Sequence, residues 1–224
     1  MADNQEDFDN IVMSELSDKE FTEKMSEDLP NILVIACGAL SQELSYLKRI
    51  NSWKNITIQC LSAELHNTPK LIPKKVKEKL DLMADDFDKV YLGYADCGTG
   101  GLLDSLLKDY NIERLPGAHC YEFFTGKNQF LSLTEEELGT FYLTDFLVKH
   151  FNRLVIKGLG MDQYPQLKNE YFKNYKKLTY LAQTESEELI NKAKQHAVFL
   201  NLEYNFYYTG LNQFKVAIER SIKA

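Results

Sequence analysis

Three of the four cysteines in the chain lie shortly after apolar segments of strand length. Cys37 follows ILVIA, Cys97 follows VYLGYAD, and Cys120 follows a shorter segment that ends in PGAH. Because the carboxyl ends of parallel strands lie at one edge of a sheet, thiols that are distant in sequence can meet there. Three thiolates can hold a 4Fe–4S cluster with one open iron, or a zinc ion completed by a histidine or water. We predict that Cys37, Cys97 and Cys120 bind a metal, with an iron–sulfur cluster as the expected cofactor and zinc as the alternative.

The spacing of the cysteines carries no metal motif by itself, since it matches neither a zinc finger nor a ferredoxin. Cys60 lies inside an apolar segment and is expected to be a core residue. The competing interpretation is that the other three thiols are also small buried hydrophobes, a common role for free cysteine. The metal prediction therefore depends on where the fold places the strand ends.

Gly98, Thr99, Gly100 and Gly101 follow Cys97 and precede a segment with helical periodicity. Backbone N–H groups at a helix N-terminus, together with the helix dipole, favour an anionic ligand. We therefore predict that these four residues bind a small anionic substrate. The segment is not a P-loop, because no Lys-Ser/Thr pair follows, and it lacks the third glycine of the dinucleotide fingerprint. The simpler alternative is a tight turn between a strand and a helix.

Other polar residues also stand at predicted strand ends and are candidates for the same site. The expected substrate-binding residues besides the glycine segment are His66, Asn67, Thr144, Asp145, Gln183 and Thr184. The expected catalytic residues are Asp96 and Glu122, as an acid/base pair, and His119, as a ligand or proton donor. The alternative roles are helix caps and turn contacts, and Thr144 before Asp145 has the pattern of a helix N-cap.

These residues need a scaffold in which strands alternate with helices, and the apolar patterning indicates one. The predicted strands are 32–36, 56–61, 90–95, 112–115, 178–182 and 203–208. The predicted helices are 41–49, 73–83, 102–109, 119–126, 143–151, 164–175, 185–200 and 212–221. This alternation predicts an α/β fold with a largely parallel sheet of about six strands and a helical middle segment. The pattern is compatible with three strand–helix–strand repeats, at 32–61, 90–115 and 178–208, or with one ordinary doubly wound sheet.

The composition is typical of a globular protein, with 44% of the 224 residues hydrophobic and 26% charged. Residues 1–29 hold ten acidic residues against two lysines, whereas the rest of the chain is nearly neutral. We expect an acidic N-terminal extension at 1–29, as a solvated arm or a docking helix, and a single α/β domain at 30–224. The short apolar stretches and the acidic start favour a cytoplasmic protein without a membrane partner. The lack of a basic stripe argues against nucleic acid as a partner.

Five segments together resemble domain-of-unknown-function family 1638 (DUF1638). They are YADCGTGG, LPGAHCYEFFTG, FYLTDFLVKHF, GLGMDQYPQLKNEYF and KLTYLAQT, and the resemblance extends over about 31–210. Members of this family occur in anaerobic bacteria and methanogenic archaea, often beside corrinoid-dependent methyltransferase systems. The resemblance implies no particular reaction. It implies an alternative role as an accessory protein that binds a methyltransferase, a corrinoid protein or their cofactor.

The residues thus lead us to expect a metalloprotein that acts as an enzyme on a small anionic substrate. The accessory role in corrinoid-dependent methyl transfer is the alternative. A third interpretation is a metal-free methyltransferase or small-molecule-binding domain, in which the cysteines are dispensable.

Overall fold

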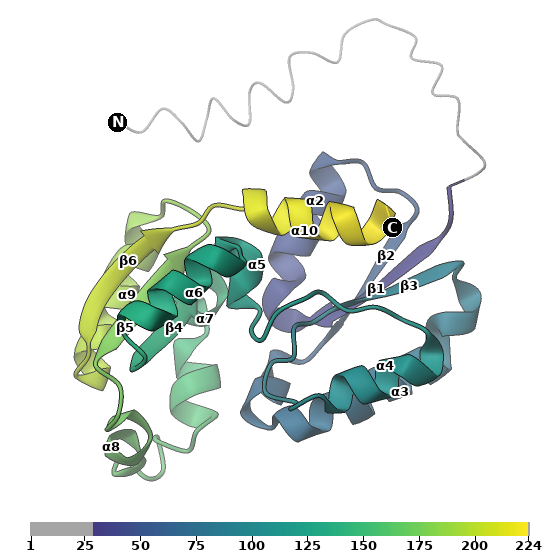
Figure 1. The fold of residues 1–224 in the computed structure, drawn as a ribbon. Coiled ribbons are helices and arrows are strands. Elements are labelled where there is room, and N and C mark those ends of the chain that lie inside the picture. The colour runs from purple at the N-terminus through teal and green to yellow at the C-terminus, as the bar shows by residue number, and fades with distance from the viewer. Residues whose placement is uncertain (1–28, 224) are drawn as a thin grey trace, which may run out of the picture.

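The structure, a computed structural model, describes residues 29–223 and contains two parallel sheets of three strands each (Figure 1). The first sheet has the order β2-β1-β3, with β1 at Ile32–Cys37, β2 at Ile56–Leu61 and β3 at Lys89–Gly93. The second has the order β4-β5-β6, with β4 at Thr140–Thr144, β5 at Lys177–Ala182 and β6 at Glu203–Tyr208. The predicted α/β class with six parallel strands is confirmed, but the strands are divided between two sheets.

The first sheet ends at β3 because the next apolar segment does not form a strand. Residues 112–115 pair with β3 only through one bridge, between Leu92 and Arg114. Pro116 has no N–H to donate, so the strand ladder is interrupted there, and only isolated backbone hydrogen bonds follow at Gly117 and Ala118. Of the three strand–helix–strand repeats considered above, those at 32–61 and 178–208 are present, and the one at 90–115 lacks its second strand.

Helices cover both sheets, mostly where the apolar periodicity predicts them. The helices in the first part of the chain are η1 (Gly38–Leu40), α2 (Ser41–Ile50), η2 (Ala63–Asn67), η3 (Pro69–Leu71), α3 (Ile72–Met83), η4 (Ala84–Asp86) and α4 (Leu102–Tyr110), the η elements being short 3-10 helices. Those that follow are α5 (Tyr121–Thr125), α6 (Lys127–Glu136), α7 (Asp145–Lys149), the π-helix η5 (Asn152–Lys157), α8 (Leu167–Phe172), α9 (Glu187–Leu200) and α10 (Asn212–Lys223). The periodicity does not predict α6 or the π-helix.

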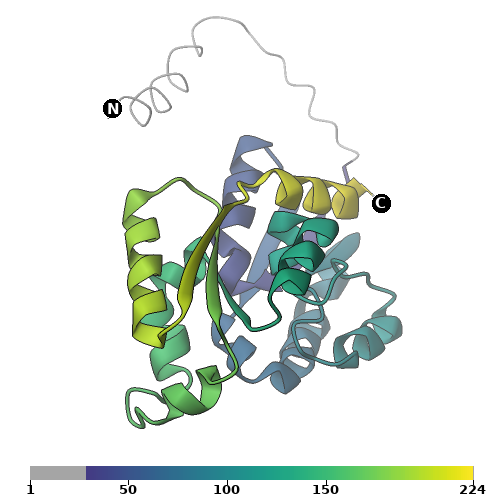
Figure 2. The ribbon, with the colours of Figure 1, turned by 60° about the vertical axis from the view of Figure 1, so that its left-hand side comes forward.

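Each sheet has its own apolar core, and the C-terminal helix crosses from one to the other. Strand β1 is buried along its whole length, and the first core also holds Leu44 of α2 and Val76 of α3. The second core contains Tyr180 of β5 and Ala193 of α9. Helix α10 follows β6 but returns to the first core, where Phe214 is buried (Figure 1, Figure 2). We call the β1–β3 sheet with its helices the first half, and the β4–β6 sheet with its helices the second half.

The predicted helix 143–151 is wrong at its start. Residues Thr140–Thr144 form β4, and α7 begins only at Asp145. Thr144 keeps an extended backbone, and its hydroxyl accepts a hydrogen bond from the Leu147 N–H. The strand therefore runs directly into a helix cap, and no loop residues separate the two patterns.

None of the helices within residues 29–223 is both long and apolar enough to cross a membrane. The acidic extension expected at 1–29 lies outside the described residues, apart from Leu29. The division into an extension and a single domain therefore stays a prediction.

Candidate functional site

Backbone pairing beyond β3 explains why two of the cysteines meet. The N–H groups of Asp96 and Cys97 donate to the carbonyls of Gly117 and Ala118, at 3.1 and 2.9 Å. This pairing runs the segment that leads to Cys120 alongside the turn that holds Cys97. Cys97 has a φ of 50°, a left-handed conformation that is uncommon for a residue other than glycine. The two Sγ atoms lie 3.0 Å apart.

Cys37 and His66 come from the two neighbouring strand ends. Cys37 ends the central strand β1, where its Sγ accepts a hydrogen bond from the Ala39 N–H at 3.4 Å. His66 lies in η2, after the edge strand β2, with its Nδ1 3.7 Å from the Cys37 Sγ. Because β1 lies between β2 and β3, adjacent strand ends deliver His66, Cys37 and Cys97 in that order.

The thiols and the imidazole shift one another's pKa values. Contact with the Cys120 thiol, aided by the His66 ring, outweighs burial and holds the pKa of Cys97 well below its usual range. The same contact with Cys97, together with burial, raises the pKa of Cys120. Desolvation of the His66 ring opposes its protonation, but contacts with Cys37 and Cys97 raise the pKa of His66 to about 10. The His66 residue as a whole is exposed, so solvent screens part of this interaction. These shifts favour a thiolate at Cys97 and a protonated ring at His66.

A buried tyrosine hydroxyl lies beside the thiols and was not foreseen from the sequence. Tyr94 is fully buried, and its hydroxyl has no hydrogen-bond partner of ordinary length among residues 29–223. Burial raises the pKa of Tyr94, and charge on Cys37 and Cys120 raises it further. Burying a hydroxyl without a hydrogen-bond partner costs folding free energy. The neighbouring thiolate sulfurs can act as acceptors for it. The only sequence signal was an aromatic residue two positions before Asp96.

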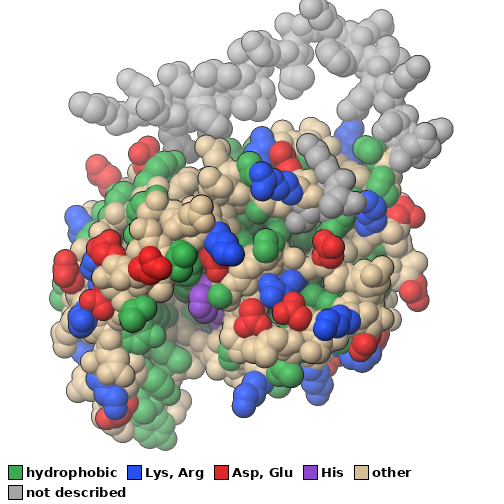
Figure 3. Space-filling view, in the orientation of Figure 1, with side chains coloured by type: hydrophobic (Ala, Val, Ile, Leu, Met, Phe, Trp, Pro, Cys, Tyr) green, Lys and Arg blue, Asp and Glu red, His purple; other side chains and the backbone are tan. Residues whose placement is uncertain are grey.

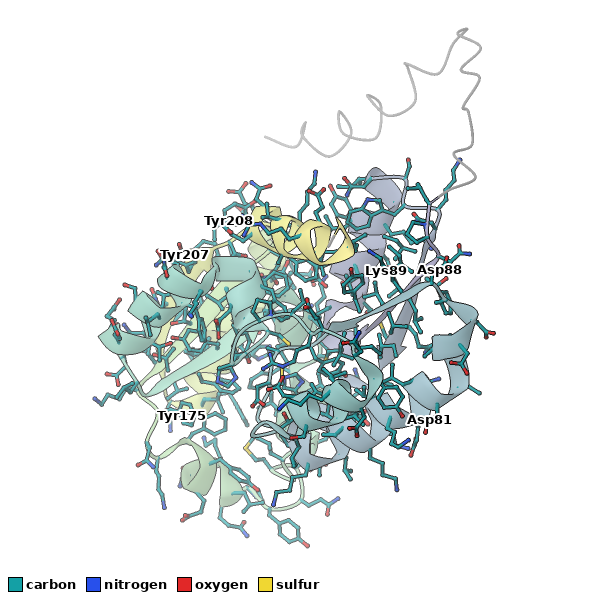
Figure 4. All side chains as sticks on the ribbon, turned by 45° about the vertical axis from the view of Figure 1, so that its right-hand side comes forward. Asp81, Asp88, Lys89, Tyr175, Tyr207 and Tyr208 are labelled. Atoms are coloured by element: carbon teal, nitrogen blue, oxygen red, sulfur yellow. The ribbon has the colours of Figure 1, made fainter. Side chains whose placement is uncertain are left out.

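A cavity of about 520 Å³ opens onto this cluster. The first half contributes Cys97, Cys120 and His66 to its wall. The residues opposite are mostly aromatic or aliphatic, and they include Tyr121, Phe124, Phe130, Phe141, Tyr142, Leu154 and Tyr175. A histidine side chain is visible in the hollow between the two halves in Figure 3, and Figure 4 shows Tyr175 at the edge of the second half. None of the described residues that line the cavity is Asp, Glu, Lys or Arg.

The glycine segment is not an open binding site for an anion. The backbone N–H groups of Gly100 and Gly101 donate to the Asp96 carboxylate at 3.1 and 2.9 Å, and the Thr99 hydroxyl donates to it at 2.7 Å. The Gly101 N–H is the main cause of a lowered pKa of Asp96. The donors expected to bind a substrate therefore bind the chain's own carboxylate, and only Gly98 of this segment lines the cavity. The structure favours the tight-turn alternative.

Of the three expected catalytic residues, only His119 lines the cavity. Its ring packs near Tyr121 and Phe130, with centroids 6.3 and 6.2 Å away. The Glu122 carboxylate instead accepts hydrogen bonds from the Ala118 and His119 N–H groups, at 2.7 and 3.3 Å, which is a cap at the start of α5. Neither Asp96 nor Glu122 reaches the cavity, so the predicted acid/base pair is not assembled there.

The polar residues expected to bind substrate from the second half mostly hydrogen-bond to one another in its interior. The Asp145 carboxylate is buried and accepts hydrogen bonds from the Tyr180 hydroxyl at 2.6 Å, the Gln183 N–H at 2.9 Å and the Thr184 hydroxyl at 2.6 Å. These contacts join β5 to α7 and leave the carboxylate without access to a substrate. Only Thr144 of this group lines the cavity. In the first half, Asn67 lines it as well, next to His66.

The separation of the Cys97 and Cys120 sulfurs can be compared with the geometry of the metal sites considered above. Among residues 29–223, no three His, Cys, Asp or Glu side chains stand at the distances of a formed metal site. Two thiolates bound tetrahedrally to one zinc ion at ~2.3 Å would lie roughly 3.8 Å apart. The Cys97–Cys120 pair, at 3.0 Å, has to open slightly to bind such an ion. A 4Fe–4S cluster needs a larger separation, because each thiolate binds a different iron. Within residues 29–223 the thiols and His66 thus form no group of three or more metal ligands, and the metal predicted from the sequence stays a prediction.

One comparison with known proteins gives a match. The family model described as "Protein of unknown function (DUF1638)" matches residues 60–218, most of the chain. This range contains His66, Cys97 and Cys120, begins after Cys37, and extends further toward the C-terminus than the resemblance noted above. No curated protein and no solved structure matches the chain. The association with corrinoid-dependent methyl transfer stays a prediction.

Proposed function

The chain belongs to the DUF1638 family, and we propose that it is a metalloprotein that binds one soft divalent ion. The Cys37, Cys97 and Cys120 thiolates are the fixed ligands, and His66 is the exchangeable fourth. The observation that carries the proposal is a pair of contacts, Cys97 with Cys120 at 3.0 Å and Cys37 with His66 at 3.7 Å, in which Cys97, Cys120 and His66 line one cavity and Cys37 lies behind His66 at the end of β1. Three cysteines and a histidine form one of the common tetrahedral zinc sets.

Metal binding changes the protonation of the cluster. The lowered pKa of Cys97 favours the thiolate that a metal needs, whereas Cys120 and the protonated His66 ring must each release a proton to solvent when the ion binds. The buried Tyr94 hydroxyl then gains a charged acceptor, because metal-bound thiolates accept hydrogen bonds from the surrounding shell. His66 is the ligand most open to solvent, so it is the one that a substrate atom can replace.

With His66 bound to the proposed ion, the described lining of the cavity holds no Asp, Glu, Lys or Arg, and we infer an uncharged substrate in place of the anionic one expected from the sequence. No described Lys or Arg lines the wall to neutralise an anion, and no Asp or Glu lines it to hold a cation. The volume of about 520 Å³ lies within the range of small-molecule pockets. Aromatic rings such as Phe130 and Tyr142, with centroids 5.1 Å apart, offer stacking surface instead.

Charge selectivity is tested with benzyl alcohol, benzoate and benzylamine, which share a shape and differ in charge. Saturation-transfer NMR on the full chain is expected to show binding of benzyl alcohol and much weaker binding of both ions. Benzoate binding as tightly as benzyl alcohol would contradict the uncharged-substrate proposal and leave the metal site unaffected.

The metal proposal is tested by titrating the reduced, metal-free chain with Co²⁺ under anaerobic conditions. We expect one ion per chain with thiolate-to-cobalt absorption, because Co²⁺ occupies zinc sites and reports its ligands. Cys37→Ser, Cys97→Ser and Cys120→Ser should each weaken binding at least tenfold. Cys60→Ser is the matched control, since Cys60 lies within β2 and, unlike the other three cysteines, has no thiol contact to a cysteine or histidine among the described residues at hydrogen-bond distance. Wild-type affinity in Cys37→Ser would overturn the proposal.

The 3.0 Å contact between Cys97 and Cys120 favours a second candidate, a thiol–disulfide couple. In that reaction the Cys97 thiolate attacks a disulfide of a partner and releases one partner thiolate. Cys120 then gives up its proton, attacks the mixed disulfide and releases the second thiolate, so that two electrons pass to the partner. Cys37→Ser separates the candidates, because a redox couple survives that change and a three-thiolate site does not.

A further inference from the structure

The π-helix in the wall of the cavity leaves one backbone carbonyl without a helical partner. In an α-helix the Leu154 carbonyl would accept from the Gly158 N–H, and in a π-helix from the Leu159 N–H. The Gly158 N–H donates to Arg153 instead, and the Leu159 N–H donates to Val155. A carbonyl left in this way needs a donor from elsewhere.

The missing donor comes from the other half of the molecule. The side-chain amide of Asn67 donates to the Leu154 carbonyl at 3.0 Å, across 87 positions of sequence. Gly158 makes room for it, since a Cβ at that position would lie 2.2 Å from the Asn67 Nδ2. We call Asn67, the Leu154 carbonyl and Gly158 the interhalf clamp.

The interhalf clamp holds the element that carries His66. Asn67 is the last residue of η2, and His66 is its immediate neighbour. A second contact between the same two segments is an ion pair of Glu64 with Arg153 at 2.9 Å, with both side chains about half exposed. An exposed pair of this kind contributes little, so the amide bond is the main restraint.

We propose that Asn67 is a positioning residue that fixes His66 against the Cys37 thiol by anchoring η2 to the π-helix of the second half. His66 can then serve as fourth ligand only while the two halves remain joined at this point. The consequence for metal binding rests on the proposed function, whereas the placement of His66 does not.

The test is Co²⁺ affinity of Asn67→Ala in the full chain. We expect a loss of roughly tenfold, the scale found when a residue that orients a metal ligand is removed. Gly158→Ala should weaken binding at least as much, because its new Cβ would lie 2.2 Å from the Asn67 amide nitrogen and 2.3 Å from the Leu154 carbonyl oxygen. Glu64→Ala, which breaks the exposed ion pair between the same segments, is the matched control and should stay within about twofold of wild type.

A double-mutant cycle distinguishes positioning from general stability. If Asn67 acts through His66, then Asn67→Ala has no further effect on Co²⁺ affinity in a His66→Ala background. An equal loss in both backgrounds, or wild-type affinity in Asn67→Ala, would overturn the proposal.

Metal-free protein gives a readout that does not depend on the proposed function. Nuclear Overhauser contacts between the His66 ring and the Cys37 β-protons should be present in wild type and Glu64→Ala, and lost in Asn67→Ala. Their persistence in Asn67→Ala would refute the positioning role. If wild type binds no Co²⁺ but these contacts are lost, the metal function fails and the positioning role stands.

Discussion

Replacing Asp96 should destabilise the fold rather than remove a catalytic acid. Its carboxylate accepts three hydrogen bonds within the turn that precedes α4, from Thr99, Gly100 and Gly101. The Oδ1 atom takes two of these bonds and Oδ2 takes the third. Asp96→Ala removes all three, whereas Asp96→Asn can keep both bonds to Oδ1.

The cost follows from the geometry and the exposure of the carboxylate. Loss of a side-chain acceptor at a helix start costs about 1–2 kcal/mol, and solvent screening keeps a half-exposed carboxylate from costing more. For a chain of this size that corresponds to a fall in melting temperature of roughly 2–8 °C for Asp96→Ala. Asp96→Asn loses one bond of three and should cost about half as much.

The difference between wild type and Asp96→Asn should depend on pH with a defined sign. The backbone N–H of Gly101 and the other donors lower the pKa of Asp96 below its unfolded value of 3.8. The contribution to stability is therefore present above pH 3.8 and lost as the pH falls through the lower folded pKa. The two proteins should thus differ at pH 6 and converge in acid.

Thermal and urea unfolding followed by circular dichroism measure these changes, with the exposed Asp109→Asn as a control near zero. An Asp96→Ala protein as stable as wild type would refute the reasoning. Loss of Co²⁺ binding or of catalysis with no loss of stability would show instead that the carboxylate acts in the chemistry.

Three further predictions concern groups inside the molecule. The rate of Cys97 alkylation by iodoacetamide in metal-free protein should rise with pH around a midpoint well below the usual thiol pKa of ~8.5, and His66→Ala should raise that midpoint. An ordinary midpoint would contradict the thiolate assignment. Asp145→Asn breaks a buried hydrogen-bond network and should lower the free energy of unfolding, measured in urea, by about 2–3 kcal/mol. Tyr204→Phe removes a hydroxyl that has no partner among the described residues and should change this free energy little, so equal effects would refute the distinction. Tyr94→Phe should leave metal-free stability unchanged or higher but weaken Co²⁺ binding, and unchanged Co²⁺ affinity would argue against a hydrogen bond from Tyr94 to a thiolate.

Apolar periodicity was sufficient for most of the fold but could not show how the strands are grouped. Segments such as 56–61 and 203–208 have the bounds that their patterns indicate. The run 112–115 was predicted as a strand, but it forms only one bridge with β3, and Pro116 directly after it has no N–H to extend the ladder. Strand β4 was missed because Thr144 ends the strand and caps the next helix at once, so a strand and a helix read as a single helix.

At the site, strand-end position placed Cys37 and Cys97 at the same edge of the first sheet, because parallel strands share one edge. Cys120 reaches Cys97 by another route, since the segment before it pairs with the turn after β3. Hydrogen-bond partners could not be read in the same way. The sequence offers Asp96 and the glycines as neighbours, but only the folded turn shows that the carboxylate occupies their amides. The role of Asn67 depends on a carbonyl that becomes free only because the helix at Leu154 is a π-helix.

The central claim is that three thiols and His66 hold a single metal ion, and metal analysis of anaerobically purified wild-type protein tests it most directly. We predict one zinc ion per chain, no inorganic sulfide, and loss of the zinc when Cys37, Cys97 and Cys120 are all replaced by serine. Several irons with matching sulfide would contradict the single-ion site. Protein that is free of metal and binds none when zinc is added would contradict the metal function altogether.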